Sequence, residues 1–359
     1  MSAVALTRVR ARDDLVRLVH RDLEPPDLAR AVSHTLVRAV PFEGICLLTV
    51  DPATLLPTSE VVEDALPPEG RARLAEIELG GRPDFNKFTM IAKGAEPAAS
   101  LSAATHGDLD RSLRQREVRR PSGFGDELRT VLTGPTGSWG TLTLLRESRR
   151  PHFTPAEVRI VSSLAPVLSD GVRRALLRER AASESPADTG VLVLDADDTV
   201  EVANAAAERW IDELSPDREA PGILPLAIGA VVLQTRSIAS GGDVGLATAR
   251  VRTAAGRWLV VRGSVVGPDR IGVLLEAARP AELASTLADT YGFTERERAV
   301  TALVARGEST AAIADRLHLS AYTVQDHLKA IFEKSGTGTR GELVARLYLD
   351  QRATDPASP

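Results

Sequence analysis

The sequence predicts a multidomain α+β protein in which two mixed α/β units precede a unit of four short helices. Three observations predict this fold class. The 359 residues are enough for two or three domains of ordinary size. Short apolar runs typical of strands alternate with amphipathic helical patterns as far as about residue 280. Beyond that point only helical patterns with recognisable start signals occur.

The composition narrows the class of protein. Hydrophobic residues make up 43% and charged residues 26% of the chain, which excludes wholesale disorder. The single cysteine, Cys46, excludes a disulfide-framed secreted scaffold. A net charge of −5 excludes a cationic field over the whole molecule that would hold nucleic acid nonspecifically. No apolar run is long enough for a membrane span or an export signal, so we expect a cytoplasmic protein. Only four of the 44 basic residues are lysine, which is typical of a GC-rich bacterial genome.

Residues 1–183 are predicted to form the first α/β unit. Two amphipathic helical patterns open it, and strand patterns follow in EGICLLTVD, DELRTVLTG and SWGTLTLLRE. After Pro151, apolar residues at helical spacing predict a long helix that ends in a cluster of arginines, where the helix dipole favours positive charge. The small polar segment 184–189 contains Pro186 and is predicted to be a linker.

Residues 190–280 are predicted to form the second α/β unit. Two apolar runs flank an acidic turn of Asp195, Asp197 and Asp198, a helix follows, and a hairpin pattern around Gly256 precedes a third strand. Clustered carboxylates would also suit the phosphoacceptor site of a receiver domain. A receiver, however, needs about five βα repeats and a parallel sheet, which this segment lacks. We therefore interpret the acidic cluster as a hairpin turn.

Residues 286–350 are predicted to form four short helices that include a helix-turn-helix. Thr294 and Glu297 have the spacing of a capping box at the first helix. Ser309 or Thr310 can cap the second helix, and Ser320 can cap the third. Only two residues separate the second helix from the cap of the third, and so short a turn predicts a helix-turn-helix.

The third and fourth helices are predicted to be amphipathic. In the third helix a stripe of apolar residues leaves polar side chains on the opposite face; the stripe consists of Val324, Leu328, Ile331 and Phe332. Thr339 and Glu342 form a second capping box at the fourth helix, whose apolar side consists of Leu343, Val344, Leu347 and Tyr348. Residues 351–359 have no apolar anchor and are predicted to be a disordered tail.

The C-terminal unit resembles the LuxR-type DNA-binding domain of bacterial transcriptional regulators. The motifs FTERERAV, GEST, IADRLHLS, YTVQDHLKAIFEK and TRGEL occur in the family's order and at its spacing. The resemblance implies that the third helix lies in the major groove, with Gln325, Asp326 and Lys329 as contact residues and Thr323 toward phosphate. Helical geometry agrees, because 325, 326 and 329 are neighbours on one face. The full predicted DNA-binding set is Ser320, Thr323, Gln325, Asp326, Lys329, Lys334 and Arg340.

Three positions depart from the pattern of the LuxR-type domain. Gln325 stands where a lysine is frequent, and Ser335 and Thr337 stand where apolar residues are usual. These departures imply that the operator sequence and the local packing differ from the usual ones of the family. They leave the predicted fold unchanged.

The two α/β units resemble sensor domains. The first resembles a GAF domain, through EGICLLTVD and through SWGTLTLLRE with the long helix after it. The second resembles a degenerate PAS domain, from GVLVLDADDTVEVANAAAERWI to GRWLVVRGS. As a class, GAF domains are known for binding small molecules between a sheet and its covering helices, so a small-molecule ligand of the sensor domain is a candidate partner. The sequence identifies no particular ligand and predicts no cofactor.

No catalytic or metal site is predicted. The six histidines, at 20, 34, 106, 152, 318 and 327, include no i, i+4 pair, so neither a metal cluster nor a haem ligand stands out. The sequence lacks a phosphate loop, a dinucleotide-binding glycine motif, H-E-x-x-H and G-x-S-x-G. We therefore expect a protein that is not an enzyme, with a catalytic sensor as the weakest alternative.

The predicted function is transcriptional regulation, with an N-terminal sensor region that modulates binding of a double-stranded DNA operator. One short helix offers few base contacts, so a homodimer on a two-fold site is expected. An exposed stripe of Leu343, Leu347 and Tyr348 on the fourth helix is the expected dimer contact, and RNA polymerase is a further candidate partner. The alternative is a protein-binding adaptor that keeps the fold without DNA affinity. The near-neutral charge of the C-terminal unit and Gln325 favour that alternative.

Overall fold

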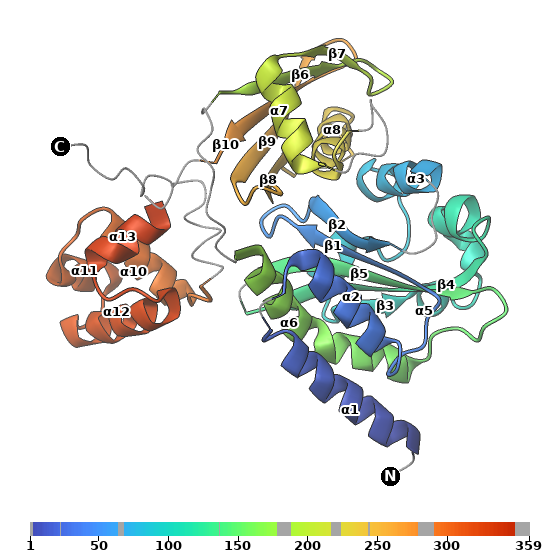
Figure 1. Ribbon diagram of the computed structural model, residues 1–359, viewed down its shortest axis with the longest axis horizontal. Helices are drawn as coiled ribbons and strands as arrows, with labels where there is room; N and C mark the ends of the chain where they lie inside the picture. Colours follow the sequence, from blue (N-terminus) through green and yellow to red (C-terminus); the bar gives the residue numbers. More distant parts are fainter. Residues whose placement is uncertain are drawn as a thin grey trace. The chain divides into compact units, whose positions relative to one another are not determined.

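The computed structural model describes residues 3–21, 23–63, 68–135, 137–177, 188–216, 224–242, 245–278 and 291–348. The chain divides into two compact units, residues 1–134 with 138–277 and residues 135–137 with 278–359 (Figure 1). The predicted combination of mixed and helical parts is confirmed, because the first unit contains two five-stranded sheets and the C-terminal helices form the second. The end of the predicted long helix beyond residue 177, most of the predicted linker and the predicted tail lie outside the described residues.

The first sheet has the strand order β2-β1-β5-β4-β3. β1 pairs antiparallel with β2 and β5, and β3 pairs antiparallel with β4. The strands are β1 (Gly44–Val50), β2 (Pro57–Glu63), β3 (Ala98–Ser100), β4 (Phe124–Gly134) and β5 (Gly137–Glu147). β1, β4 and β5 correspond to the three strand patterns that the sequence predicts.

Three helices and one face of this sheet enclose the largest hydrophobic core, which contains Leu15, Leu36, Leu128, Trp139 and Leu164. The helices are α1 (Ala3–Leu18), α2 (Pro25–Leu36) and α6 (Pro155–Leu177). α6 and the end of α1 approach closely at Gly171, where an added Cβ would lie 2.7 Å from Cγ1 of Val19. A larger residue at 171 would therefore force α6 away from the N-terminal helices.

The opposite face of the first sheet is covered by short pieces of chain. They are α3 (Pro68–Leu79), α4 (Phe88–Lys93), the 3-10 turn η1 (Leu109–Arg111) and the π-helical turn η2 (Gln115–Arg119). The short helix α5 (Leu101–Ala104) follows β3 directly, and the backbone N–H and hydroxyl of its Ser102 donate to the carboxylate of Asp126 in β4. Successive side chains of a strand point to opposite faces. In β4, Leu128 and Leu132 join the core with α6, whereas Glu127 and Arg129 point to the η2 side and form ion pairs there.

The second sheet is antiparallel throughout, with the strand order β7-β6-β10-β9-β8. Its elements are β6 (Gly190–Leu194), β7 (Val200–Ala203), α7 (Ala205–Leu214), α8 (Leu226–Ala239), β8 (Thr248–Arg252), β9 (Trp258–Gly267) and β10 (Arg270–Ala277). Antiparallel pairing excludes the receiver alternative for this segment.

The acidic cluster of the second unit is a hairpin turn between β6 and β7, as predicted. Oδ1 of Asp195 accepts hydrogen bonds from the backbone N–H groups of Asp197 and Thr199, both at 2.9 Å. Asp198 has a φ of 59° and its carboxylate pairs with Arg236. The aspartates therefore shape and anchor the turn.

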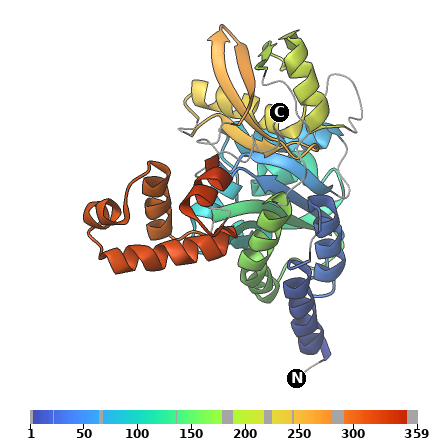
Figure 2. The same ribbon diagram turned by 60° about the vertical axis from the view of Figure 1, so that its left-hand side comes forward.

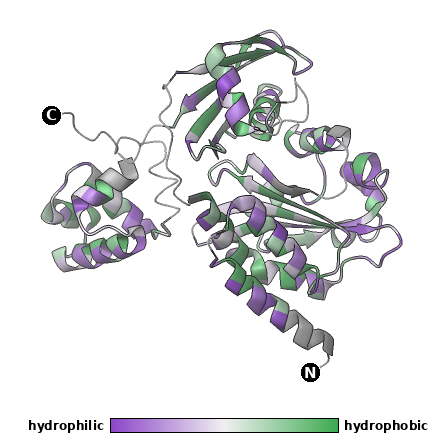
Figure 3. Cartoon of the chain, in the orientation of Figure 1, coloured by the Kyte–Doolittle hydropathy of each residue, from purple (hydrophilic) through white to green (hydrophobic). Residues whose placement is uncertain are grey.

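Several elements have no counterpart in the sequence prediction, namely α3, α4, α5, β2, β3 and α8. α8 is apolar on most of its circumference and lies against the second sheet, with residues such as Ile228 and Val231 fully buried. A helix that is buried on most sides gives no amphipathic signal. Figure 3 shows that helices such as α2 and α12 carry hydrophilic and hydrophobic residues side by side.

The β1–β2 turn, residues 51–56, links the two sheets within the first unit. The fully buried carboxylate of Asp51 accepts hydrogen bonds from the backbone N–H of Arg250 in β8 at 2.7 Å and from its guanidinium at 3.0 Å. Leu56, also in the turn, packs into the core of the second sheet. The two sheets therefore share apolar contacts and an ion pair between a buried carboxylate and a partly exposed arginine.

The C-terminal unit consists of α10 (Glu295–Ala305), α11 (Thr310–Leu317), α12 (Ala321–Ser335) and α13 (Arg340–Tyr348), drawn in orange and red (Figure 2). Its core contains Phe293, Val300, Ile313, Val324 and Ile331. The four helices and the predicted buried stripe of α12 are thereby confirmed. Within the ranges that the structure describes, no helix has the length and apolar character needed to cross a membrane.

Candidate nucleic-acid interface

The turn between α11 and α12 has the geometry of a helix-turn-helix. His318 ends α11 in the left-handed conformation, with a φ of 55°, which lets the chain reverse direction within one residue. Leu319 follows, and the side chain of Ser320 caps α12 by accepting a hydrogen bond from the N–H of Thr323 at 3.0 Å. The predicted cap and the predicted two-residue separation are both confirmed.

α12 presents one buried and one exposed face. Val324 and Ile331 are fully buried and Leu328 is 6% exposed, as the predicted stripe requires. Gln325, Asp326 and Lys329 are all exposed. The structure therefore brings these three predicted contact residues together on one solvent-facing surface, as their spacing implies.

The three predicted contact residues of α12 are not engaged by the rest of the described chain. Among the described residues, no hydrogen bond or ion pair involves the side chains of Gln325, Asp326 or Lys329. Arg316, a potential partner for Asp326, instead pairs with Glu308 at 3.3 Å. The polar groups of this face are therefore available to a ligand.

Ser320 and Thr323 lie at the start of α12, where their hydroxyl oxygens are 2.8 Å apart. Both hydroxyls are close to the first backbone N–H groups of the helix, which lack partners inside the helix and attract anions. This placement is compatible with the predicted phosphate contact of Thr323.

Lys334 lies in the last turn of α12 and connects this helix to the start of α10. Its ammonium donates to Oε2 of Glu297 at 2.6 Å and to the carbonyl of Gly292 at 3.1 Å. Burial raises the pKa of Glu297, but hydrogen bonds from Lys334 and from the Thr294 backbone lower it by more, so the net shift is downward. The predicted capping box of Thr294 and Glu297 is present, and Lys334 extends it to a third group.

Arg340 begins α13 and ties it to the turn before α11. Its guanidinium donates to the carbonyl of Glu308 at 2.9 Å and to the hydroxyl of Thr310 at 2.8 Å. Lys334 and Arg340 thus have roles inside the fold, and their predicted contacts with DNA remain predictions.

The fourth helix differs from the prediction in two respects. Leu343 is fully buried in the core, so it cannot belong to an exposed dimerisation stripe, and that part of the prediction is wrong. The side chains of Leu347 and Tyr348 lie outside the described residues. Thr339 caps the helix by accepting from the N–H of Glu342 at 3.1 Å, but the Glu342 carboxylate accepts from Gly338 instead of Thr339.

Ser335 and Thr337, the two polar residues at usually apolar positions, form a hydrogen bond with each other. Ser335 is buried, and its hydroxyl lies 2.7 Å from the carbonyl of Ile331 and 2.8 Å from the hydroxyl of Thr337. Because buried hydroxyls are costly only when unpaired, these departures fit the fold.

An open pocket of about 440 Å³ follows the C-terminal part of α12. Its lining combines apolar and polar side chains with the turn before α13, and consists of Gln325, Leu328, Lys329, Phe332, Glu333, Gly336, Thr337 and Gly338. Two of the predicted contact residues therefore stand beside a recess in the surface.

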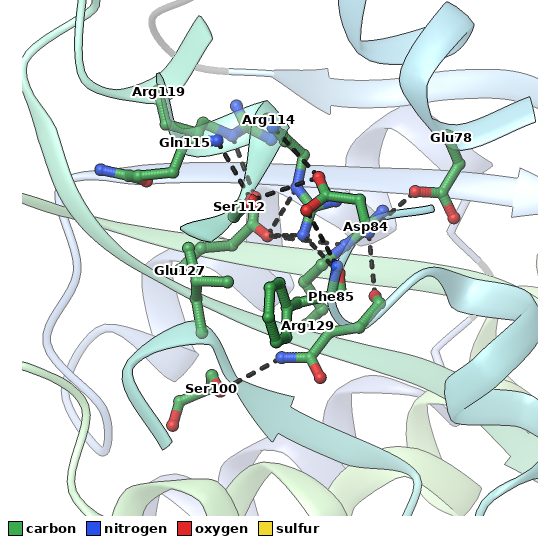
Figure 4. A network of polar contacts seen from close by, with 12 residues as sticks. Glu78, Asp84, Phe85, Ser100, Ser112, Arg114, Gln115, Arg119, Glu127 and Arg129 are labelled. Atoms are coloured by element: carbon green, nitrogen blue, oxygen red, sulfur yellow. Dashed lines mark hydrogen bonds and ion pairs between the residues drawn. The ribbon is translucent and has the colours of Figure 1, made fainter. Parts of the chain in front are cut away.

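A network of buried charges lies in the first unit, between β4 and the short pieces that cover it (Figure 4). Oε1 of Glu127 accepts hydrogen bonds from Nε and Nη2 of Arg114 at 2.9 and 2.7 Å, and Oε2 accepts from Nε of Arg119 at 3.0 Å. Nη1 of Arg114 also pairs with Asp84 at 3.1 Å. Burial alone raises the pKa of Glu127. The guanidinium groups of Arg114, Arg119 and Arg129 lower this pKa by more than burial raises it, so that the net value is about 2.

The network occupies the face of the first sheet that is opposite to α6. Arg129 pairs with Glu78 at 2.8 Å and lies over the ring of Phe88, with its Cζ 3.6 Å from the ring centroid. The sequence does not predict this network. The signal available was the charged alternation of Glu127 and Arg129 around Leu128, which ordinarily indicates a solvated strand face.

Among the described residues, no three His, Cys, Asp or Glu side chains lie close enough to one another to bind a metal ion.

Comparisons with known proteins agree with the helical geometry. Residues 292–347 match the family model described as bacterial regulatory proteins, luxR family. No curated protein matches the chain in sequence.

Three solved structures show a weak likeness to this chain. SdiA from Escherichia coli is 13% identical over 97% of this chain and 99% of that chain, with a TM-score of 0.33. The VqsR LBD domain from Pseudomonas aeruginosa is 13% identical over 48% of this chain and 98% of that chain, with a TM-score of 0.33. VqmA from Vibrio cholerae is 19% identical over 46% and 83%, with a TM-score of 0.21. TM-scores this low add no argument about the fold. On the family match and the geometry of α10–α13, residues 292–347 are a helix-turn-helix domain of the LuxR type.

Proposed function

We propose that this protein is a DNA-binding transcriptional regulator whose N-terminal sensor region modulates operator binding by the helix-turn-helix. One observation carries the proposal: the exposed face of α12 offers Gln325, Asp326 and Lys329 without an internal partner among the described residues. In a helix-turn-helix, here α11 and α12, the second helix is the element that enters the major groove. Amide, carboxylate and ammonium groups are the types that hydrogen-bond base edges.

The charge of the domain favours sequence-specific contacts over a general cationic surface. Residues 286–350 contain nine acidic and eight Lys or Arg residues. A near-neutral domain gains little from nonspecific attraction to phosphates. Affinity must therefore come from a few side chains placed against particular bases and phosphates.

Selection from a randomised duplex library, followed by mobility shifts over a range of salt concentrations, tests the proposal. The full chain should enrich a particular sequence, and its affinity should fall as salt rises. Binding that enriches no sequence and shows no salt dependence would instead favour the protein-binding adaptor.

A two-fold related operator and a homodimer are part of the proposal, because paired half-sites double the number of base contacts. Leu343 is buried and so takes no part in the dimer contact. Footprints that protect one unsymmetrical half-site, with a monomeric bound species, would contradict this.

Control by the N-terminal region, which resembles GAF and PAS sensors, gives a further prediction. Because the β1–β2 turn couples the two sheets through Asp51 and Arg250, a change in one is expected to reach the other. A region that modulates operator binding changes that binding when it is removed, so deleting residues 1–280 should change the DNA affinity or the transcriptional output of the helix-turn-helix. Equal affinity and output with and without these residues would refute the regulatory part of the proposal, while leaving DNA binding intact.

Asp326 is expected to set base preference more than affinity. A carboxylate can only accept hydrogen bonds, and the N4 amine of cytosine is the suitable donor in the major groove. Asp326→Ala should relax preference at one base pair and leave nonspecific affinity unchanged or higher, since a negative charge leaves the interface. Selection with the variant and the wild type side by side measures this, and an unaltered base profile would count against it.

A further inference from the structure

Tyr322 is an exposed aromatic residue in the first turn of α12. Its side chain is 74% exposed, and it is the one exposed aromatic residue among those whose side chains the structure describes. No hydrogen bond or ring contact within the described residues involves this side chain. A phenol ring in this position contributes nothing to the core, so its removal should leave the fold intact.

Helical geometry places Tyr322 at the centre of the exposed face. It precedes Gln325, Asp326 and Lys329 by three, four and seven residues, spacings that bring side chains onto one face. At 3.6 residues per turn, Asp326 lies about 40° to one side of Tyr322 and Lys329 about 20° to the other. Val324, on the buried side, points away from this face.

The central position favours contact with bases over contact with phosphates. N-terminal residues of a recognition helix are the ones that reach base edges. Residues on the centre line of such a helix face the floor of the groove, whereas Thr323, at its side, faces a strand of the backbone. The ring of Tyr322 offers mainly apolar surface, and the apolar group on the floor of the major groove is the C5 methyl of thymine.

We propose that Tyr322 reads a thymine by packing its ring against the C5 methyl group of that base. The inference rests on the proposed DNA-binding function and adds a specificity-determining residue to it. The hydrogen-bonding side chains around the ring then read the neighbouring bases, and the phenol hydroxyl is not needed for this contact.

Replacing thymine by deoxyuridine removes the methyl group alone and so tests the contact. The full chain first selects a duplex from a randomised library, and each thymine of that duplex is then replaced singly by deoxyuridine. At one thymine of each half-site the wild type should lose about fourfold in affinity, the expected effect of burying one methyl group. Tyr322→Ala should show a similar loss on the unmodified duplex and no further loss with deoxyuridine at that position.

Tyr322→Phe is the matched control, because it keeps the ring and removes the hydroxyl. This variant should retain both the affinity and the sensitivity to deoxyuridine. If Tyr322→Phe is as weak as Tyr322→Ala, the hydroxyl makes the contact and the proposal is wrong. It is also wrong if Tyr322→Ala, with an unchanged circular dichroism spectrum, binds like the wild type or keeps its sensitivity to deoxyuridine. A wild-type chain that enriches no sequence would remove the DNA-binding function itself, and this inference with it.

Discussion

Arg114→Ala is expected to lower the free energy of unfolding of the N-terminal unit by about 3–5 kcal/mol, the usual cost of breaking a buried ion pair from one side. The Arg114 side chain is 2% exposed and pairs with Glu127 and Asp84, each 1% exposed. Removing the guanidinium leaves two carboxylates buried without their main counter-charge. Urea unfolding followed by tryptophan fluorescence measures the change, since Trp139 is fully buried in the core on the other side of the same sheet.

Arg120→Ala is the control for that measurement. Arg120 comes from the same segment and pairs with Asp110, but the two side chains are 56% and 50% exposed. Pairs in that setting contribute about 1 kcal/mol or less. Equal losses for the two variants would contradict the view that the buried network holds the covering segments onto the sheet.

The second large effect is expected at the DNA interface, where Lys329→Ala should weaken operator binding by about 1–3 kcal/mol. An ammonium at a phosphate or a guanine edge makes a charge-assisted hydrogen bond, and alanine cannot replace it. If the contact is to phosphate, the plot of log affinity against log salt should also flatten by about one unit. Titrations of wild type and variant against the selected duplex at several salt concentrations give both quantities.

Lys93→Ala supplies a matched control, because Lys93 is an exposed lysine at the end of α4 in the other unit. Its removal subtracts the same charge and should leave affinity and salt slope unchanged. If Lys329→Ala behaves like Lys93→Ala, then Lys329 does not contact DNA.

The helix-turn-helix could be predicted from sequence because its determinants are local. The caps of Thr294 and Ser320 act within three residues of themselves, and the buried stripe from Val324 to Ile331 repeats within one helix. The prediction that Leu343 is exposed is wrong because a short helix with several apolar residues does not show which of them meets the core. That choice depends on how α13 packs against the other helices.

The charged network and the link between the sheets could not be predicted, because both depend on contacts between distant residues. Asp51 and Arg250 are separated by 199 positions, and Arg129 and Glu78 by 51. From the sequence alone, each of these residues is predicted to be a charged side chain on the solvent-exposed surface. Only the folded arrangement shows that their partners lie close enough to compensate for burial.

The central claim is tested most directly by equilibrium binding of the full chain to two duplexes, the selected one and a scrambled one of equal composition. The same measurement is then made with the double variant Gln325→Ala, Lys329→Ala. The wild type should prefer the selected duplex by at least about 10³-fold, the lower bound for specific over nonspecific binding. The double variant should lose most of that preference while keeping its folded structure. Equal affinities of the wild type for both duplexes, or a preference untouched by the two substitutions, would contradict the assignment of DNA recognition to the exposed face of α12.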